Sequence, residues 1–152
     1  MATRTADFMR AALREAEAAA SAGEVPVGAV IVQSGEILAR AQNRVERDRD
    51  PTAHAEVLAI RAACRLLGLK QLPGAEILVT LEPCAMCAQA ISLARLERLT
   101  FAAYDPKGGG VEHGARVFDH ATCHHRPDVV GGLLEREAGL QLRRFFQGLR
   151  GG

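Results

Sequence analysis

The feature that most constrains the fold is a strand–helix–strand pattern between residues 76 and 103. Glu76 to Leu81 is a short β-rich apolar run, about Cys84 to Ala94 has helical spacing, and Leu99 to Ala103 is again strand-like. The whole unit is short enough for one βαβ crossover, which joins parallel strands through a right-handed connection. The middle of the chain is therefore predicted to be α/β, with Glu76–Leu81 as a central strand.

Before this unit, the sequence predicts a helix and a hairpin. Residues Asp7 to Ala20 place their apolar side chains on one face of an amphipathic helix. Val25 to Val32 is nearly all apolar, and after Ser34-Gly35 the chain resumes as Glu36 to Ala41. We expect a hairpin that turns at Ser34-Gly35, with a first strand buried on both faces and a second strand nearer the sheet edge.

The remaining elements follow from apolar spacing and from helix-ending residues. They are a helix over Ala53–Leu67 with Thr52 as its N-cap and Gly68 as its stop, a long irregular stretch over Val111–Arg126, a short strand over Asp128–Val130 and a closing helix over Leu133–Phe146. No repeat, linker or low-complexity segment is evident, so the elements are expected to share one core.

Composition limits the class of protein. The chain has 152 residues, 48% apolar and 24% charged, and we expect residues 1–152 to form a single domain. No apolar run approaches the roughly 20 residues of a membrane span, and the first residues lack a secretory signal, so we expect a cytoplasmic protein. A net charge of +1 excludes a strongly basic nucleic-acid wrapper but allows a local basic patch.

The strongest chemical signal is Pro83-Cys84-Ala85-Met86-Cys87 at a strand-to-helix junction. Two cysteines three residues apart face one way, and a helix N-terminus favours the thiolates that bind metal. His54 opens the preceding helix and supplies a nitrogen ligand suited to zinc. Three protein ligands leave a fourth position for water, which zinc activates, and Glu56 is close enough to move its proton. The predicted chemistry is hydrolytic.

Two other readings of the cysteines stay open at this point. A Cys-x-x-Cys pair near a βαβ unit is also typical of a thiol redox site. Alternatively, Cys64 or Cys123 would complete a closed structural zinc site. Neither reading explains Glu56. The histidines of the late loop suggest either a second metal site or local hydrogen bonding; they are His113, His120, His124 and His125.

The pairing of His54-Ala55-Glu56 with the cysteine motif resembles the zinc-dependent cytidine/deoxycytidylate deaminase superfamily. More narrowly, the chain is similar to the bacterial tRNA-specific adenosine deaminase family from its first helix through Phe145-Phe146. The matching segments are Glu24-Val25-Pro26-Val27-Gly28-Ala29-Val30, Asn43-Arg44, Asp50-Pro51-Thr52-Ala53-His54-Ala55-Glu56, Val79-Thr80-Leu81-Glu82-Pro83-Cys84-Ala85-Met86-Cys87 and Asp105-Pro106-Lys107-Gly108-Gly109.

This resemblance implies a three-layer α/β/α fold around a mixed five-stranded sheet. It also implies hydrolytic conversion of adenosine to inosine at the wobble position of a tRNA anticodon, by a homodimer with one Zn²⁺ per subunit. His54, Cys84 and Cys87 would hold the zinc, and Glu56 would be the catalytic proton shuttle. The residues implied to bind the substrate anticodon stem-loop are Asn43, Asp105, Lys107, Arg126, Phe145 and Phe146.

Some of these implied contacts have alternatives. Either phenylalanine would serve equally well to pack the last helix onto the sheet, and Arg126, Arg143, Arg144 and Arg150 are each candidates for phosphate contacts or for plain surface charges. The sequence also departs from the family, because Glu112-His113 stands where a small Gly-Ser pair is expected. A deaminase of a free base such as guanine or cytosine would keep the same zinc core, and a non-catalytic zinc or redox module is a third hypothesis.

Overall fold

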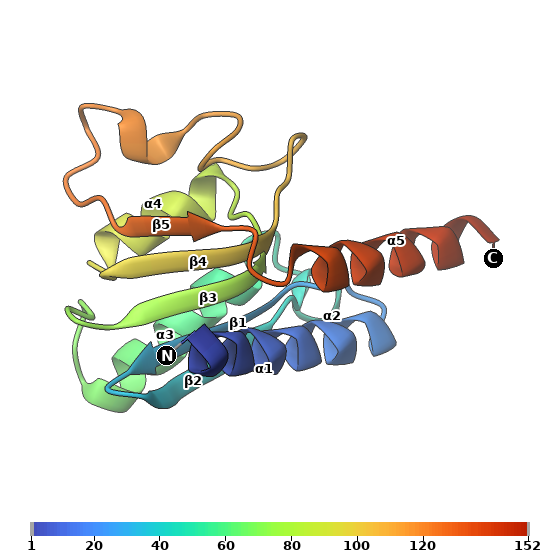
Figure 1. Cartoon of the computed structure of the whole chain (residues 1–152), viewed down its shortest axis with the longest axis horizontal. Helices are drawn as coiled ribbons and strands as arrows, with labels where there is room; N and C mark the ends of the chain where they lie inside the picture. Colours follow the sequence, from blue (N-terminus) through green and yellow to red (C-terminus); the bar gives the residue numbers. More distant parts are fainter. Residues whose placement is uncertain (1, 152) are drawn as a thin grey trace.

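The computed structural model describes residues 2–151, with side chains over residues 4–149, and shows a mixed sheet between two layers of helices (Figure 1). The five strands lie in the order β2-β1-β3-β4-β5. The elements are α1 (Ala2–Ser21), β1 (Gly28–Gln33), β2 (Glu36–Gln42), α2 (Val45–Asp48), α3 (Ala55–Leu67), β3 (Glu76–Leu81), α4 (Ala85–Leu93), β4 (Arg98–Ala103), the 3₁₀ helix η1 (Val117–Asp119), β5 (Asp128–Gly131) and α5 (Glu135–Gly151).

Strand pairing confirms the predicted βαβ unit. β3 and β4 are parallel and joined through α4, and β5 adds a further parallel strand beside β4. β1 is antiparallel to both β2 and β3, which makes the sheet mixed and places β2 at its edge. The carboxyl ends of β3 and β4 therefore lie at the same edge of the sheet, where α/β proteins commonly build their sites.

The hairpin turn lies where the sequence predicts it. Ser34 and Gly35 both have positive φ angles, 53° and 77°, as two-residue turns that match the twist of the strands require. Most of β1 is buried, whereas β2 is largely exposed or half-buried. A Cβ atom on Gly28 would overlap the backbone of Ala12 and Ala16, so only glycine lets α1 pack this closely against β1.

The two faces of the sheet are covered by different helices. α3 and α4 pack on one face through small buried residues such as Ala59 and Ala88, together with Ile77 and Val79 of β3. α1 and α5 cover the other face, where the intervening Leu78 of β3 points (Figure 1). β3 is apolar on both faces because both faces are covered, and the three-layer α/β/α expectation is confirmed.

The expected boundaries of two helices need correction. α3 begins at Ala55 rather than Ala53, and Thr52 does not cap it. Thr52 instead donates from its backbone nitrogen and its hydroxyl to Asp50, at 2.8 and 2.7 Å. The Ala55 N–H donates to the side-chain oxygen of Asn43 at 2.9 Å, so a residue twelve positions earlier supplies the cap. α5 spans Glu135–Gly151 rather than Leu133–Phe146, and Gly68 ends α3 in the left-handed conformation as predicted.

The long stretch after β4 is ordered by bonds to the body of the protein. The Ser92 hydroxyl of α4 donates to the His125 carbonyl at 2.7 Å, and the His125 ring donates to the Leu96 carbonyl at 2.7 Å. These bonds fix the loop beside α4. Over the described residues, no helix combines the length and the apolar character that crossing a membrane would require.

Candidate metal centre and substrate cavity

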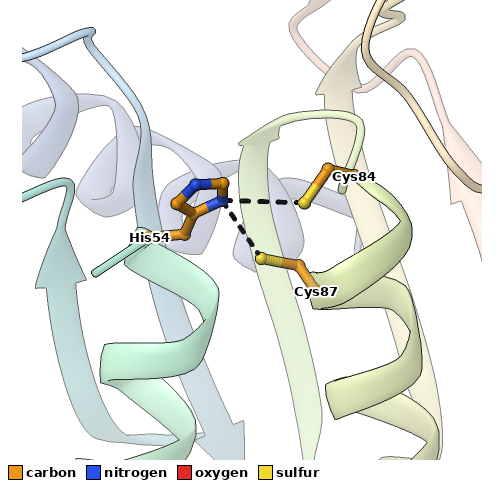
Figure 2. Close-up of side chains that lie close together, drawn as sticks. All are labelled: His54, Cys84 and Cys87. Atoms are coloured by element: carbon orange, nitrogen blue, oxygen red, sulfur yellow. Dashed lines mark hydrogen bonds between the residues drawn. The ribbon is translucent and has the colours of Figure 1, made fainter. Parts of the chain in front are cut away.

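His54, Cys84 and Cys87 come together where α3 and α4 begin (Figure 2). His54 and Cys84 occupy the N-cap positions of their helices, in extended conformation, and Cys87 lies in the first turn of α4. Both helices cover the same face of the sheet, so their starting points converge. We call these three residues the His–Cys cluster.

The spacing of the cluster fits a tetrahedral zinc ion. His54 Nδ1 lies 3.6 Å from Cys84 Sγ and 3.5 Å from Cys87 Sγ. Zinc bonds of about 2.3 Å to sulfur and 2.0 Å to nitrogen, at tetrahedral angles, require a sulfur–nitrogen separation of about 3.5 Å. Among the described residues, this is the one group of three or more His, Cys, Asp or Glu side chains with metal-binding spacing.

The electrostatics of the cluster also favour a cation. A hydrogen bond from Cys87, with a smaller contribution from His54, lowers the pKa of the Cys84 thiol to about 4 in spite of burial. The same neighbouring thiolate, together with burial, raises the pKa of Cys87. One sulfur is therefore stable as a thiolate and opposes ionisation of the other, a repulsion that a divalent cation between them would relieve.

Glu56 is buried in the first turn of α3, two residues after His54. Burial, with a smaller contribution from the nearby Cys84 thiolate, raises the pKa of its carboxyl to about 7 against the lowering effect of its own backbone N–H. A carboxyl group that titrates near neutrality is suited to accepting and returning a proton.

A cavity of about 490 Å³ opens beside the cluster. Its lining includes His54, Glu56 and Cys84, together with apolar side chains such as Val27 and Leu81. The volume lies within the range of roughly 300–1,000 Å³ that is typical of small-molecule pockets, and an apolar lining with a few polar groups is their usual composition. The cavity can therefore bring an organic substrate of modest size to the cluster.

Four of the six residues expected at the substrate line this cavity. These are Asn43, Asp105, Phe145 and Phe146. Lys107 is exposed beside them without lining the cavity. Arg126 is also exposed, and it donates to the His120 carbonyl at 3.4 Å in the late loop. The side chain of Arg150 lies outside the described residues.

Two of the lining residues are already engaged within the protein. Asn43 caps α3 with its oxygen, and its amide nitrogen donates to the Val25 carbonyl at 3.2 Å. Asp105 accepts hydrogen bonds from the backbone of Lys107 and Gly108, at 3.2 and 2.9 Å. Both side chains thus shape the cavity wall as well as lining it.

The Phe pair, Phe145 and Phe146, stands at the cavity and outside the two core clusters. Their ring centroids lie 5.3 Å apart at an interplanar angle of 77°. α5 packs on the sheet through Ala138 and Leu142 instead. The absence of both rings from the two core clusters favours a place in the cavity wall over packing of the last helix onto the sheet.

The alternatives that recruit further ligands find no support among the described residues. Cys64 and Cys123 do not join the cluster, and Cys123 instead contacts Ser92 and the His125 carbonyl. Three of the four loop histidines make local hydrogen bonds through their rings: His113 to Glu82, His120 to the Ala115 carbonyl and His125 to the Leu96 carbonyl.

Two buried carboxylates at the cavity were not predicted from the sequence. Glu24 accepts bonds from the backbone of Glu46 and Arg47, and Glu82 accepts bonds from the segment after β4. Burial alone would raise the pKa of each carboxyl group, but these hydrogen bonds outweigh burial and lower it. For Glu82, the sequence offered one signal: an acidic residue at the end of an apolar strand, directly before the cysteine motif.

Residues 2–103 match the family model for the cytidine and deoxycytidylate deaminase zinc-binding region. The chain is similar to the tRNA-specific adenosine deaminase of Agrobacterium fabrum, with 55% identity over 97% of this chain and 96% of the relative. A solved structure from a study of A-to-I editing by tRNA:A34 deaminases at the wobble position of transfer RNA is 54% identical. Its alignment with this protein has a TM-score of 0.88 and covers 89% of this chain and 98% of the solved chain.

A guanine deaminase from Nitrosomonas europaea is also similar in structure, with a TM-score of 0.80 over 92% of this chain and 83% of that chain. Its sequence identity is 26%, less than half of the 55% identity to the Agrobacterium fabrum relative. The matching family model places the chain in the wider family, and the higher identity to the tRNA-specific adenosine deaminases indicates the branch. The chain therefore belongs to the cytidine and deoxycytidylate deaminase family, in the branch of the tRNA-specific adenosine deaminases.

Proposed function

We propose that this protein hydrolyses adenosine to inosine at the wobble position of a tRNA anticodon, with release of ammonia. The observation that carries the proposal is the His–Cys cluster beside a buried Glu56, at a cavity large enough for a nucleoside. Similarity to tRNA-specific adenosine deaminases along 97% of the chain supports the choice of substrate.

In this proposal His54 Nδ1 and the sulfurs of Cys84 and Cys87 would hold one Zn²⁺ per subunit. The chemistry that the metal would supply there is a lower pKa for a water molecule, which would make that water a nucleophile near neutral pH. Glu56 would accept one proton from this water and deliver it to the purine ring as the water oxygen bonds to C6. It would then move the second proton from the new hydroxyl group to the amino group, which leaves as ammonia when its bond to C6 breaks. Its raised pKa, near 7, suits both directions of proton transfer.

Substrate recognition is assigned to the cavity wall. An anticodon base has to leave its stack to reach a buried site, and single-stranded loops allow this at low cost. The Phe pair offers aromatic faces on which a neighbouring base can stack. Asn43 and Asp105 contact the flipped nucleoside, and Lys107 and Arg126 supply positive charge for the surrounding RNA.

We also assign the active form to a cytoplasmic homodimer in which residues 1–152 form one domain. Large apolar side chains are exposed on α3, just after it and on α4, which lie on the same face of the sheet: Leu66, Leu67, Leu69, Met86 and Leu93. Exposed apolar side chains on neighbouring helices are typical of a subunit interface. The cysteines are free thiols, as is usual in a reducing compartment.

The substrate assignment is tested with a transcribed anticodon stem-loop that carries a wobble adenosine. Inosine is measured by nucleoside mass spectrometry, and ammonia release is measured in parallel for free adenosine, guanine and cytosine. We expect inosine from the stem-loop alone, and none from a matched stem-loop in which guanosine replaces the wobble adenosine. Ammonia release from a free base, with the stem-loop unchanged, would overturn the substrate assignment and favour a free-base deaminase.

A further inference from the structure

The segment from Asp105 to His113 forms part of the cavity wall and is irregular throughout. Irregular segments of this length need partners for their backbone N–H groups. Several of those groups converge on a single side chain, the carboxylate of Glu82 at the end of β3. Glu82 is buried, with 2% of its surface exposed.

Five donors share the two oxygens of this carboxylate. Oε1 accepts from the Asp105 backbone at 3.0 Å and from His113 Nδ1 at 2.8 Å. Oε2 accepts from three successive backbone groups, those of Val111, Glu112 and His113, at 3.2, 2.9 and 3.1 Å. One carboxylate therefore ties together the two ends of the 105–113 segment.

The glycines of this segment are explained by the same close packing. A Cβ atom on Gly109 would overlap the Glu82 carboxylate, and one on Gly110 would lie 2.5 Å from the Ala85 nitrogen. The Gly110 N–H also donates to the Pro83 carbonyl at 2.8 Å. The segment thus rests directly on Glu82 and on the start of α4, where Cys84 belongs to the His–Cys cluster.

Glu82 has no acceptor capacity left for a proton-transfer role. A carboxylate offers about four lone-pair sites, and five donors already occupy them. Its effect on a substrate has to pass through the segment that it holds. Asp105 and Gly108, which line the cavity, are the residues of this segment that a substrate would meet.

We propose that Glu82 is a positioning residue: it fixes the 105–113 segment in the conformation that binds the RNA around the target nucleoside. The expected effect on KM rests on the proposed function. The expected effect on the order of the 105–113 segment rests on the hydrogen bonds alone. Because the segment is already ordered before the substrate binds, less conformational entropy is lost on binding.

His113 adds a side-chain hydrogen bond to the four backbone hydrogen bonds that Glu82 accepts. Its ring bonds Glu82, and its edge meets Tyr104 with centroids 6.2 Å apart. His113→Ser removes the ring while leaving all four backbone donors in place. It therefore provides a milder second variant, in which the Glu82 carboxylate is retained.

The main test is Glu82→Gln, which keeps the shape of the side chain but replaces one carboxylate oxygen with an NH₂ group. That NH₂ group then faces the N–H donors that Oε1 or Oε2 accepts from in the wild type. The matched control is Glu76→Gln, which removes a carboxylate from the opposite end of β3. We would measure hydrogen exchange by mass spectrometry, zinc content, and KM and kcat on the anticodon stem-loop. Hydrogen exchange measures how well the 105–113 segment is held in place, and it does so independently of catalytic activity.

For Glu82→Gln we expect faster exchange over residues 105–113, unchanged zinc content, and a KM raised about tenfold with a much smaller change in kcat. His113→Ser should shift exchange and KM in the same direction by less, and Glu76→Gln should match the wild type. These outcomes together would support the positioning role.

Unchanged exchange in both Glu82→Gln and His113→Ser would overturn the inference. Faster exchange with loss of zinc, or with a fall in kcat at constant KM, would also overturn it, because the residue would then act on the cluster. If Glu82→Gln does not fold, His113→Ser decides by the same criteria. If the wild type leaves the stem-loop unchanged, the proposed function fails, and exchange alone decides whether Glu82 holds the segment.

Discussion

The His–Cys cluster and the outer wall of the cavity are built in different ways. The cluster comes from side chains at two helix starts: Cys84 lies three residues after the end of β3, and His54 lies twelve residues after the end of β2. The outer wall consists of the Phe pair on α5 and the 105–113 segment, and that segment is held by a carboxylate more than twenty positions earlier in the chain. Chemistry therefore resides in short motifs, whereas substrate contact depends on long-range packing.

This difference predicts how each region responds to change. A variant in the cluster should abolish turnover on every substrate, because it removes the reacting group. A variant in the wall should change the apparent affinity for RNA and leave the chemical step largely intact. Four variants test this division, taken in order of expected effect.

Cys84→Ala should have the largest effect. It removes one of three ligands, and loss of the metal forfeits several kcal/mol of transition-state stabilisation, or roughly a thousandfold or more in kcat. Zinc content measured by atomic emission should fall together with inosine formation. Cys64→Ala, which lies outside the cluster, is the control. Full activity in a zinc-free Cys84→Ala protein would contradict the assignment.

Phe146→Ala should raise KM for the stem-loop by about tenfold, because stacking of one base on an aromatic ring contributes about 1–3 kcal/mol. The ring is 39% exposed, so stability should change little. Leu140→Ala is the matched control, since Leu140 is a comparably exposed apolar residue of α5 that does not line the cavity. In steady-state kinetics, a fall in kcat alone for Phe146→Ala would contradict the stacking role. The same result for Phe146→Ala and Leu140→Ala would also contradict it.

Asn43→Ala should reduce stability, because it removes the cap of α3. Loss of an N-cap costs about 1 kcal/mol, measured as a shift in the urea midpoint. Asn43→Asp keeps an oxygen for the Ala55 N–H and should retain most of that stability, while losing the donor to Val25. Equal destabilisation by both substitutions would show that loss of the cap on α3 is not the cause of the reduced stability.

Arg126→Ala should have the smallest effect of the four. The residue is exposed and lies away from the cavity, so its proposed role is a phosphate contact. Loss of one such contact should raise KM by about threefold for any stem-loop sequence and make binding less sensitive to salt. Arg40→Ala, on the edge strand β2, should have no such effect. A tenfold change restricted to one anticodon sequence would instead indicate base recognition.

The two regions also differ in how far the sequence could predict them. The gathering of His54, Cys84 and Cys87 follows from local motifs, because helices that follow strands of one sheet begin at a common edge. The β3–α4–β4 unit and the Ser34-Gly35 turn are likewise encoded by short-range patterns.

Long-range partners explain what the sequence could not predict. Thr52 is a good capping residue by type, yet Asn43 reaches the end of α3 across the fold and Thr52 bonds Asp50 instead. Glu82 and Glu24 bind backbone N–H groups of distant segments. Backbone donors are present at nearly every residue, so they leave no pattern in a sequence.

The most direct test of the account compares wild type with Glu56→Gln, both shown to contain one zinc per chain, in single-turnover reactions on the wobble-adenosine stem-loop. Removing the proton shuttle while keeping the metal and the fold should slow inosine formation by about a hundredfold or more, with binding of the stem-loop unchanged. Inosine formation by Glu56→Gln at the wild-type rate would contradict the proposed mechanism.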